Sequence, residues 1–289
     1  MKKSKKEKSG RKSFFAELSD EMRTHKVTFW VYVILRFVVI GFTVFSAFRG
    51  QWENVFTCVL TLMLFLIPAF VERSFRVNLP SLLEVIVLLF VFAAQILGEI
   101  QCYYIKYPLW DTMLHTVNGF IFAAAGFALV DVLNNNDKIK FSLRPVYMAL
   151  VAFCFSMTVG VLWEFFEYFA DFFLHTDMQK DRIINEISSV MLDPSGSNTP
   201  VIIDGIKDVT VNGSDLDLGG YLDIGLHDTM KDLLVNFIGA VVFSIIGFIY
   251  VRNRGRKRSV AALFIPTLKN DRDEKTTEDK IADEKENTN

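Results

Sequence analysis

Six blocks of apolar residues alternate with polar segments along the chain of 289 residues. A helix of about 20 residues, rising 1.5 Å per residue, crosses a hydrocarbon core of about 30 Å, so each block predicts a membrane-spanning helix. The sequence therefore predicts an all-α fold, a polytopic transmembrane bundle of six helices. The predicted spans are residues 27–48, 54–71, 82–101, 111–132, 146–173 and 228–251.

Three polar segments flank or interrupt these spans. Residues 1–26 form a basic tail, in which residues 13–25 have the pattern of an amphipathic helix lying on the membrane surface. Residues 252–289 form a second polar tail, and both tails have too few apolar residues to predict order. The loop 174–227 contains β-branched runs and an Asn212-Gly213 turn signal, which predict a small hairpin.

The lysines and arginines predict the orientation of the spans. Nine of them precede residue 27, and five more lie in the sequence RNRGRKR that follows the last span. The short loops on the opposite side carry only Arg49 and Lys106. The positive-inside rule then puts both termini in the cytoplasm of a multi-pass cell-membrane protein, with the loop 174–227 outside.

Composition and short motifs do not select a function, but the absence of familiar catalytic motifs argues against several enzyme classes. A hydrophobic share of 51% and a net charge of -2 are near those of soluble domains, so the segregation of the residues carries the membrane prediction. The sequence contains no HExxH, GxSxG, Walker A or GxGxxG pattern. RNRGRKR is better explained as a topology anchor near anionic lipid than as a nucleic-acid site, so no nucleic-acid partner is predicted.

Three stretches place ionisable groups inside apolar spans: WDTMLHTVNG, LWEFFEYFAD and HDTMKDLLVNFIGA. Ionisable groups at membrane depth are costly and usually functional. The third and fifth spans run outward and carry their acids late, whereas the fourth and sixth run inward and carry theirs early. At 1.5 Å per residue, four helices thus bring polar groups to one depth near the outer face.

Helical periodicity also places these groups on shared faces. At about 100° per residue, Asp111, His115 and Asn118 fall within an arc of about 60°. Glycines on or beside the polar faces, at positions 119, 160 and 239, predict close approach of the helix backbones. The predicted catalytic residues are His115, Glu164, Glu167 and Asp232, and the predicted substrate-binding or orienting residues are Glu99, Asp111, Asn118, Asp228 and Asn236.

Asp111 and Asp228 have a simpler alternative explanation. Each opens a predicted helix with the sequence Asp-Thr-Met, where an aspartate is a good N-cap. His115, Glu164, Glu167 and Asp232 lie within helices and cannot cap them, so a functional role is favoured for these four.

The order of these residues resembles that of the VanZ-like membrane proteins and of the related YjdF-type family. The shared pattern is Asp111 with His115, then the acid pair Glu164 and Glu167, then an Asp-x-x-x-Asn-x-x-Gly sequence that starts at Asp232. Glu167 stands where VanZ-like proteins often have Gln, so the resemblance is closer to the YjdF-type branch. It implies a bacterial integral membrane protein and no specific reaction.

So many carboxylates in a partly dehydrated site require a cation or shared protons. Asp111, His115, Glu164, Glu167 and Asp232 are candidate ligands for Mg²⁺, Mn²⁺, Ca²⁺ or Zn²⁺. The favoured hypothesis is an enzyme that acts on a membrane lipid or a lipid-linked envelope precursor, with His115 or Glu164 as acid or base. A proton- or ion-coupled transporter and a membrane binding or scaffold protein remain as alternatives.

Overall fold

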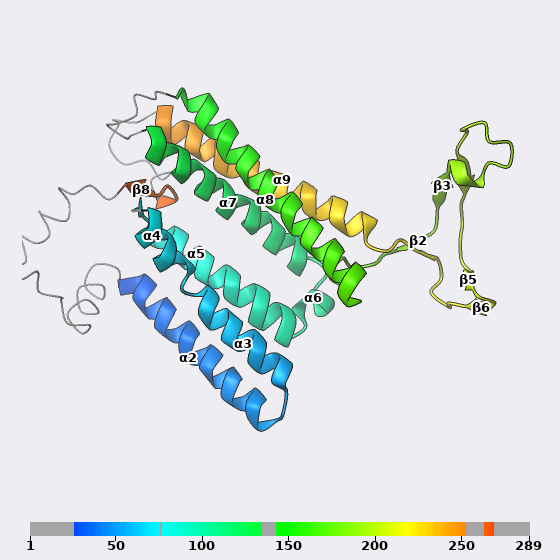
Figure 1. Ribbon diagram of the computed structural model, residues 1–289, viewed down its shortest axis with the longest axis horizontal. Helices are drawn as coiled ribbons and strands as arrows, with labels where there is room; N and C mark the ends of the chain where they lie inside the picture. Colours follow the sequence, from blue (N-terminus) through cyan, green and yellow to red (C-terminus); the bar gives the residue numbers. More distant parts are fainter. Residues whose placement is uncertain (1–25, 76, 135–142, 253–262, 269–289) are drawn as a thin grey trace, which may run out of the picture. The chain divides into compact units, whose positions relative to one another are not determined.

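The computed structural model describes residues 26–75, 77–134, 143–252 and 263–268 (Figure 1). These residues contain six helices that are long and apolar enough to cross a membrane, which confirms the predicted all-α membrane fold. Their bounds are Val27–Phe48, Trp52–Ser74, Ser81–Ile100, Trp110–Asp131, Pro145–Leu174 and Leu226–Arg252. The predicted surface helix over residues 13–25 lies outside the described residues. The orientation of the termini stays a prediction.

The chain divides into two compact units, which are described separately below. The first comprises Met1–Trp110, Ala128–Pro145 and Gly247–Asn289. The second comprises Asp111–Phe127 and Val146–Ile246. All the candidate site residues except Glu99 therefore belong to the second unit.

The first unit is built on three packed helical segments. They are α2 (Lys26–Phe48), α3 (Trp52–Leu64) and α5 (Ser81–Phe92), and Figure 1 shows them side by side. The core between them consists of buried apolar side chains that include Val39, Cys58 and Leu88. The second span breaks after α3 and resumes as α4 (Ile67–Phe75), because Pro68 has no N–H to donate to the carbonyl of Leu64.

The third span does not stay α-helical to its end. After α5 it continues as a π-helix, η1 (Ala93–Ile100), and then as the short helix α6 (Tyr103–Lys106). Glu99 lies in this π-helical turn and is exposed. Extrapolating a regular α-helix to residue 101 was therefore wrong over these last two turns.

Part of the predicted C-terminal tail is ordered. Strand β8 (Thr267–Leu268) pairs antiparallel with β1 (Val77–Asn78), which lies between the second and third spans. Ile265, just before β8, is only 1% exposed. The prediction of disorder across residues 252–289 was thus too broad, because a short apolar sequence, Leu263–Ile265, interrupts the polar tail, and Ile265 within it is buried.

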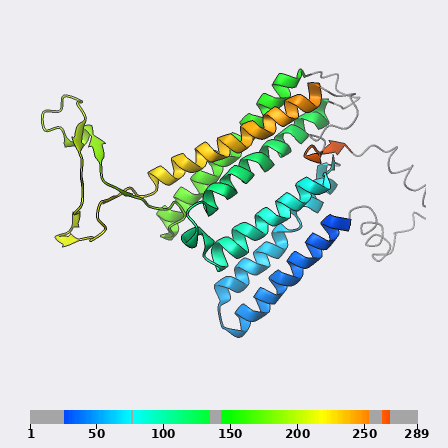
Figure 2. The same ribbon diagram turned by 180° about the vertical axis from the view of Figure 1, so that it is seen from behind.

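In the second unit, residues from α7 (Trp110–Asn134), α8 (Pro145–Leu174) and α9 (Leu226–Arg252) pack side by side (Figure 2). A Cβ atom added at Gly119 would collide with the backbone of Asn236, and one added at Gly239 would collide with the backbone of Thr116. The Ser156 hydroxyl of α8 donates a hydrogen bond of 2.7 Å to the Gly119 carbonyl of α7. The predicted close approach at these glycines is confirmed.

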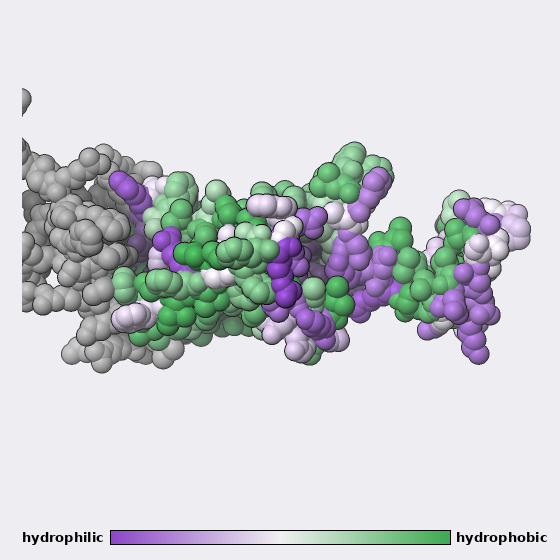
Figure 3. Space-filling model, turned by 90° about the horizontal axis from the view of Figure 1, so that it is seen from below, coloured by the Kyte–Doolittle hydropathy of each residue, from purple (hydrophilic) through white to green (hydrophobic). Residues whose placement is uncertain are grey.

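The loop between α8 and α9 forms three short antiparallel strand pairs. They are β2 (Ile183–Ile184) with β7 (Tyr221–Leu222), β3 (Ile187–Ser189) with β4 (Val201–Ile203), and β5 (Thr210–Val211) with β6 (Ser214–Asp215). Asn212 and Gly213 join the last pair with φ angles of 53° and 83°, as a two-residue hairpin turn requires. The predicted hairpin is confirmed. Figure 3 shows hydrophobic residues over the helices and many hydrophilic residues on this loop.

Candidate functional site

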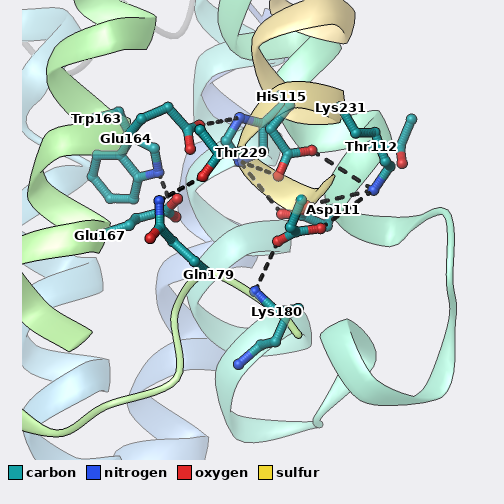
Figure 4. A network of polar contacts seen from close by, with 12 residues as sticks. Asp111, Thr112, His115, Trp163, Glu164, Glu167, Gln179, Lys180, Thr229 and Lys231 are labelled. Atoms are coloured by element: carbon teal, nitrogen blue, oxygen red, sulfur yellow. Dashed lines mark hydrogen bonds and ion pairs between the residues drawn. The ribbon is translucent and has the colours of Figure 1, made fainter. Parts of the chain in front are cut away.

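Ionisable side chains from three helices meet in the second unit, and Figure 4 shows Asp111, His115, Glu164 and Glu167 among them. Asp111 and His115 come from the first turns of α7, Glu164 and Glu167 from the later part of α8, and Asp228 and Asp232 from the first turns of α9. We call these six residues the acidic cluster. Five of them are buried, and Asp232 is only 2% exposed. The structure thus brings together residues that the sequence placed at one depth.

His115 lies between carboxylates on all three helices. Its Nε2 atom is 3.5 Å from Asp111 Oδ1 and 4.0 Å from Asp232 Oδ2, while its Nδ1 atom is 3.8 Å from Glu164 Oε1. A neutral imidazole carries a proton on only one of its nitrogens. His115 can therefore donate to a carboxylate on one side while it presents a lone pair to the other.

Lys231 neutralises one side of the cluster and was missed in the sequence analysis. Its Nζ atom lies 3.7 Å from Asp232 Oδ1, 3.9 Å from Asp228 Oδ1 and 4.0 Å from Asp111 Oδ2. Its side chain is 24% exposed, so the charged end reaches the cluster from the more accessible side. Its spacing of three residues from Asp228, one helical turn away, is the sequence signal that could have identified it.

The opposite side, formed by Glu164 and Glu167, is held differently. Trp163 Nε1 donates a hydrogen bond of 2.7 Å to Glu167 Oε1. Across the described residues, no lysine or arginine forms an ion pair with either glutamate. Charge compensation in the cluster is therefore uneven. Trp163, which precedes Glu164 in the sequence, was also missed as a site residue.

The segment that follows α8 folds back over the start of α9. Asp171 accepts hydrogen bonds from the backbone N–H groups of Met178 and Gln179, at 2.6 and 2.8 Å. Gln179 Nε2 in turn donates to Thr229 Oγ1 at 2.6 Å, and the Lys180 backbone N–H donates to Asp228 Oδ2 at 2.9 Å. Asp171 and Gln179 thus connect the loop to the helix that carries Asp228 and Asp232.

Asp223 caps α9. Its carboxylate accepts from the backbone N–H groups of Gly225 and His227, and from that of Arg182 at 2.7 Å. Burial alone raises a carboxyl pKa, but these three donors outweigh burial and hold the pKa of Asp223 below its ordinary value. Asp228 accepts from Lys180 and lies inside the first turn, so the N-cap explanation of Asp228 is wrong. Asp111 likewise lies inside α7, which begins at Trp110.

The remaining predicted residues occupy other places. Asn236 is 1% exposed, and its Nδ2 atom contacts Met157 Sδ at 3.7 Å at the level where Gly119 and Gly160 pack against it. Asn118 is half-buried, and no hydrogen bond or ion pair among the described residues joins it to the cluster. Glu99 belongs to the first unit, so its membership of the site stays a prediction.

Two trios in the cluster have metal-ligand spacing: Asp111, His115 and Asp232, and His115, Glu164 and Glu167. In each trio the donor atoms lie within 4.8 Å of one another. A cation with bonds of about 2.0–2.2 Å separates its ligands by roughly 3–4 Å, so small side-chain movements would complete either set. Several buried oxygens have no hydrogen-bond partner, namely Asp111 Oδ2, Glu164 Oε2, Asp232 Oδ1 and Asn236 Oδ1.

Comparisons with known proteins identify the family and not the reaction. A family model described as predicted membrane protein (DUF2238) matches residues 29–253, a range that includes every residue of the cluster. Searches of curated proteins and of solved structures found no match. The matching family is the YjdF-type one, and no comparison supports the VanZ-like group specifically. Because the match covers most of its length, the chain belongs to the DUF2238 family of predicted membrane proteins.

Proposed function

We propose that this protein is a cell-membrane enzyme that performs acid–base chemistry on the polar head group of a lipid or a lipid-linked envelope precursor. The observation that carries the proposal is the position of His115, whose two ring nitrogens face carboxylates from different helices at 3.5 to 4.0 Å. A group that can receive a proton on one side and release one on the other is what general acid–base catalysis needs.

A purely structural cluster would satisfy its own polar atoms, because unpaired buried polar groups are costly. Here Glu164 Oε2 and Asp232 Oδ1 are buried without hydrogen-bond partners. Asp232 lies in the second turn of α9, and Glu164 lies in the later part of α8, a helix long enough to project beyond the hydrocarbon core, so both are expected near the level of lipid head groups. Glu164 Oε2 is therefore available to a ligand or a reacting group at that level, whereas Asp232 Oδ1 already faces the Lys231 ammonium group at 3.7 Å.

The residues of the cluster divide into roles by position. His115 transfers the proton, and Glu164 and Asp232 are the carboxylates on its two sides. Lys231 balances the charge of Asp232, Asp228 and Asp111. Asn236, one turn further along α9 than Asp232, orients the neighbouring side chains of the site. With the N-terminus inside, as the positive-inside rule predicts, the substrate would come from the outer leaflet.

Packing beside the cluster favours this function over transport. One turn further along α9 from Asp232, Asn236 is in contact with Gly119 and Gly160, and a Cβ atom at either glycine would collide with it. This tight contact holds the three helices together at that level, with the cluster on one side of it. The cluster is therefore better suited to a reaction at one end of the helices.

The experiment is a comparison of lipid and lipid-linked precursor profiles in a deletion strain complemented with wild type, Glu164→Gln or Glu186→Gln. Glu186 provides the matched control, since it is an exposed loop glutamate that undergoes the same chemical change. We expect the wild type and Glu186→Gln to restore the profile, whereas Glu164→Gln does not. An identical profile in the deletion strain and the complemented strains would contradict the proposal.

A further inference from the structure

We propose that His115, Glu164 and Glu167 bind a divalent transition-metal ion, with Mn²⁺ and Zn²⁺ as the ions that these donors fit. All three side chains are buried, and they offer one nitrogen and two carboxylate oxygens within 4.8 Å of one another. An imidazole ligand favours Mn²⁺ or Zn²⁺ over Mg²⁺ or Ca²⁺, which prefer oxygen ligands alone.

The uneven charge of the cluster selects this trio over the other one. Lys231 lies 3.7 Å from Asp232 and 4.0 Å from Asp111, so its ammonium group already occupies the trio that contains these two aspartates. No lysine or arginine in the described residues pairs with Glu164 or Glu167. Among the described residues, a cation is therefore missing on the glutamate side, where Glu164 Oε2 is buried without a hydrogen-bond partner.

Two neighbouring residues, Asp111 and Trp163, orient the ligands His115 and Glu167, as second-layer residues do in metal sites. Metal-binding histidines commonly donate their second N–H to a carboxylate, which fixes the tautomer and directs the other nitrogen at the metal. Asp111 Oδ1 lies 3.5 Å from His115 Nε2, and this contact leaves Nδ1 facing Glu164. On the other side, Trp163 Nε1 holds Glu167 Oε1 at 2.7 Å, which leaves the second oxygen of Glu167 available.

The metal site changes one part of the proposed function, the role of His115, and rests on that function only for the part that the ion plays in the reaction. A bound cation would polarise an oxygen of the head group, and His115 would then act as a ligand while Asp232 takes over as the proton-transferring carboxylate. Binding itself can be measured without knowing the substrate.

The test uses the full-length protein in detergent, stripped with a chelator, loaded with Mn²⁺ or Zn²⁺, separated from free ions and analysed by elemental mass spectrometry. We expect about one ion per wild-type chain, as for a single site with three protein ligands and one open position. Glu164→Gln and Glu167→Gln should each lose the ion. Asp111→Asn replaces the carboxylate next to His115 Nε2 with a neutral amide, and it should bind the ion about 10- to 100-fold more weakly. Glu186→Gln should bind as the wild type does.

A second readout guards against variants that fail to fold. Pulsed electron paramagnetic resonance of the Mn²⁺-loaded wild type should detect a directly bound nitrogen, and this signal should disappear in His115→Gln. A folded wild type that binds no ion, or one whose bound Mn²⁺ shows no nitrogen, would overturn the metal site. Ion binding lost in Asp232→Asn but retained in Glu167→Gln would do the same. Metal binding with an unchanged lipid profile would retain the site and reject only the proposed function.

Discussion

Lys231 provides most of the positive charge next to the three aspartates of the acidic cluster. It lies within 4.0 Å of Asp111, Asp228 and Asp232, whereas Arg182 reaches only Asp228, at 3.9 Å. Removing a cation from buried carboxylates leaves their repulsion uncompensated. Lys231 is therefore the main cation among the described residues that stabilises this end of the helices.

We predict that Lys231→Met lowers the free energy of unfolding by about 1–3 kcal/mol, less than for a fully buried pair because Lys231 is partly exposed. The loss should shrink as the pH falls, since protonated carboxyl groups do not repel one another. Thermal unfolding of the purified protein over a pH series measures both effects. Lys180→Met is the control, because Lys180 is exposed and its ammonium group contacts Asp177. Equal melting temperatures for Lys231→Met and Lys180→Met would contradict the prediction.

At the level of single residues, the sequence predicted depth and facing well. His115, Glu164 and Asp232 were placed together by rise per residue and angular spacing alone, and the structure puts His115 within 4.0 Å of both acids. Lys231 and Trp163 were missed because a lysine beside an aspartate, or a tryptophan near a span end, has ordinary explanations. Their roles depend on which neighbour each side chain reaches, and a one-dimensional pattern does not contain that information.

Helix packing in the second unit depends on glycine at the contact points. We predict that Gly119→Ala and Gly239→Ala each cost on the order of 1–3 kcal/mol, because the added methyl group meets the backbone of the neighbouring helix. Gly41→Ala is the matched control, since nothing lies within 4 Å of a Cβ atom at this helical glycine. It should be neutral or stabilising by up to about 1 kcal/mol. Equal unfolding temperatures for the three variants would show that the close approach is not needed.

The cap of α9 predicts a dependence on pH. The folded pKa of Asp223 lies below its ordinary value, so its contribution to stability is complete above the unfolded pKa of about 3.9 and is lost as the pH falls through the folded pKa. Asp223→Asn loses the charge and one acceptor oxygen, so it should cost about 1–2 kcal/mol at neutral pH, and the difference from wild type should shrink as the pH falls below about 3.9 and through the folded pKa. Melting temperatures from pH 7 to pH 3 check this. Asp204→Asn, at an exposed loop residue, should match the wild type throughout.

Helices and strands were predictable from the sequence where a single local signal determines them. Hydropathy gave six spans, and the Asn212-Gly213 pair gave the β5–β6 hairpin, because each signal is local. The π-helix at Ala93–Ile100 and the β1–β8 pair were not predictable. A π-turn differs from an α-turn only in its hydrogen-bonding register, and β8 is defined by a partner far away in the sequence.

The orientation of the whole molecule stays a prediction, and it can be measured directly. In a Cys102→Ser background, a cysteine introduced at the exposed loop residue Ser197 should react with a membrane-impermeant maleimide in intact cells. A cysteine introduced at Ser9 in the basic tail should react only after permeabilisation. The reverse labelling pattern would invert the topology and would move the acidic cluster to the cytoplasmic side.

The β1–β8 pair has a consequence for how the protein is made. Val77 pairs with Leu268, so its partner leaves the ribosome only after all six spans have been synthesised. The first three helices must therefore enter the bilayer while this backbone edge has no partner strand. A nascent chain that ends before residue 267 would contain all six spans. It would still lack β8, the strand that pairs with β1 in the turn between the second and third spans.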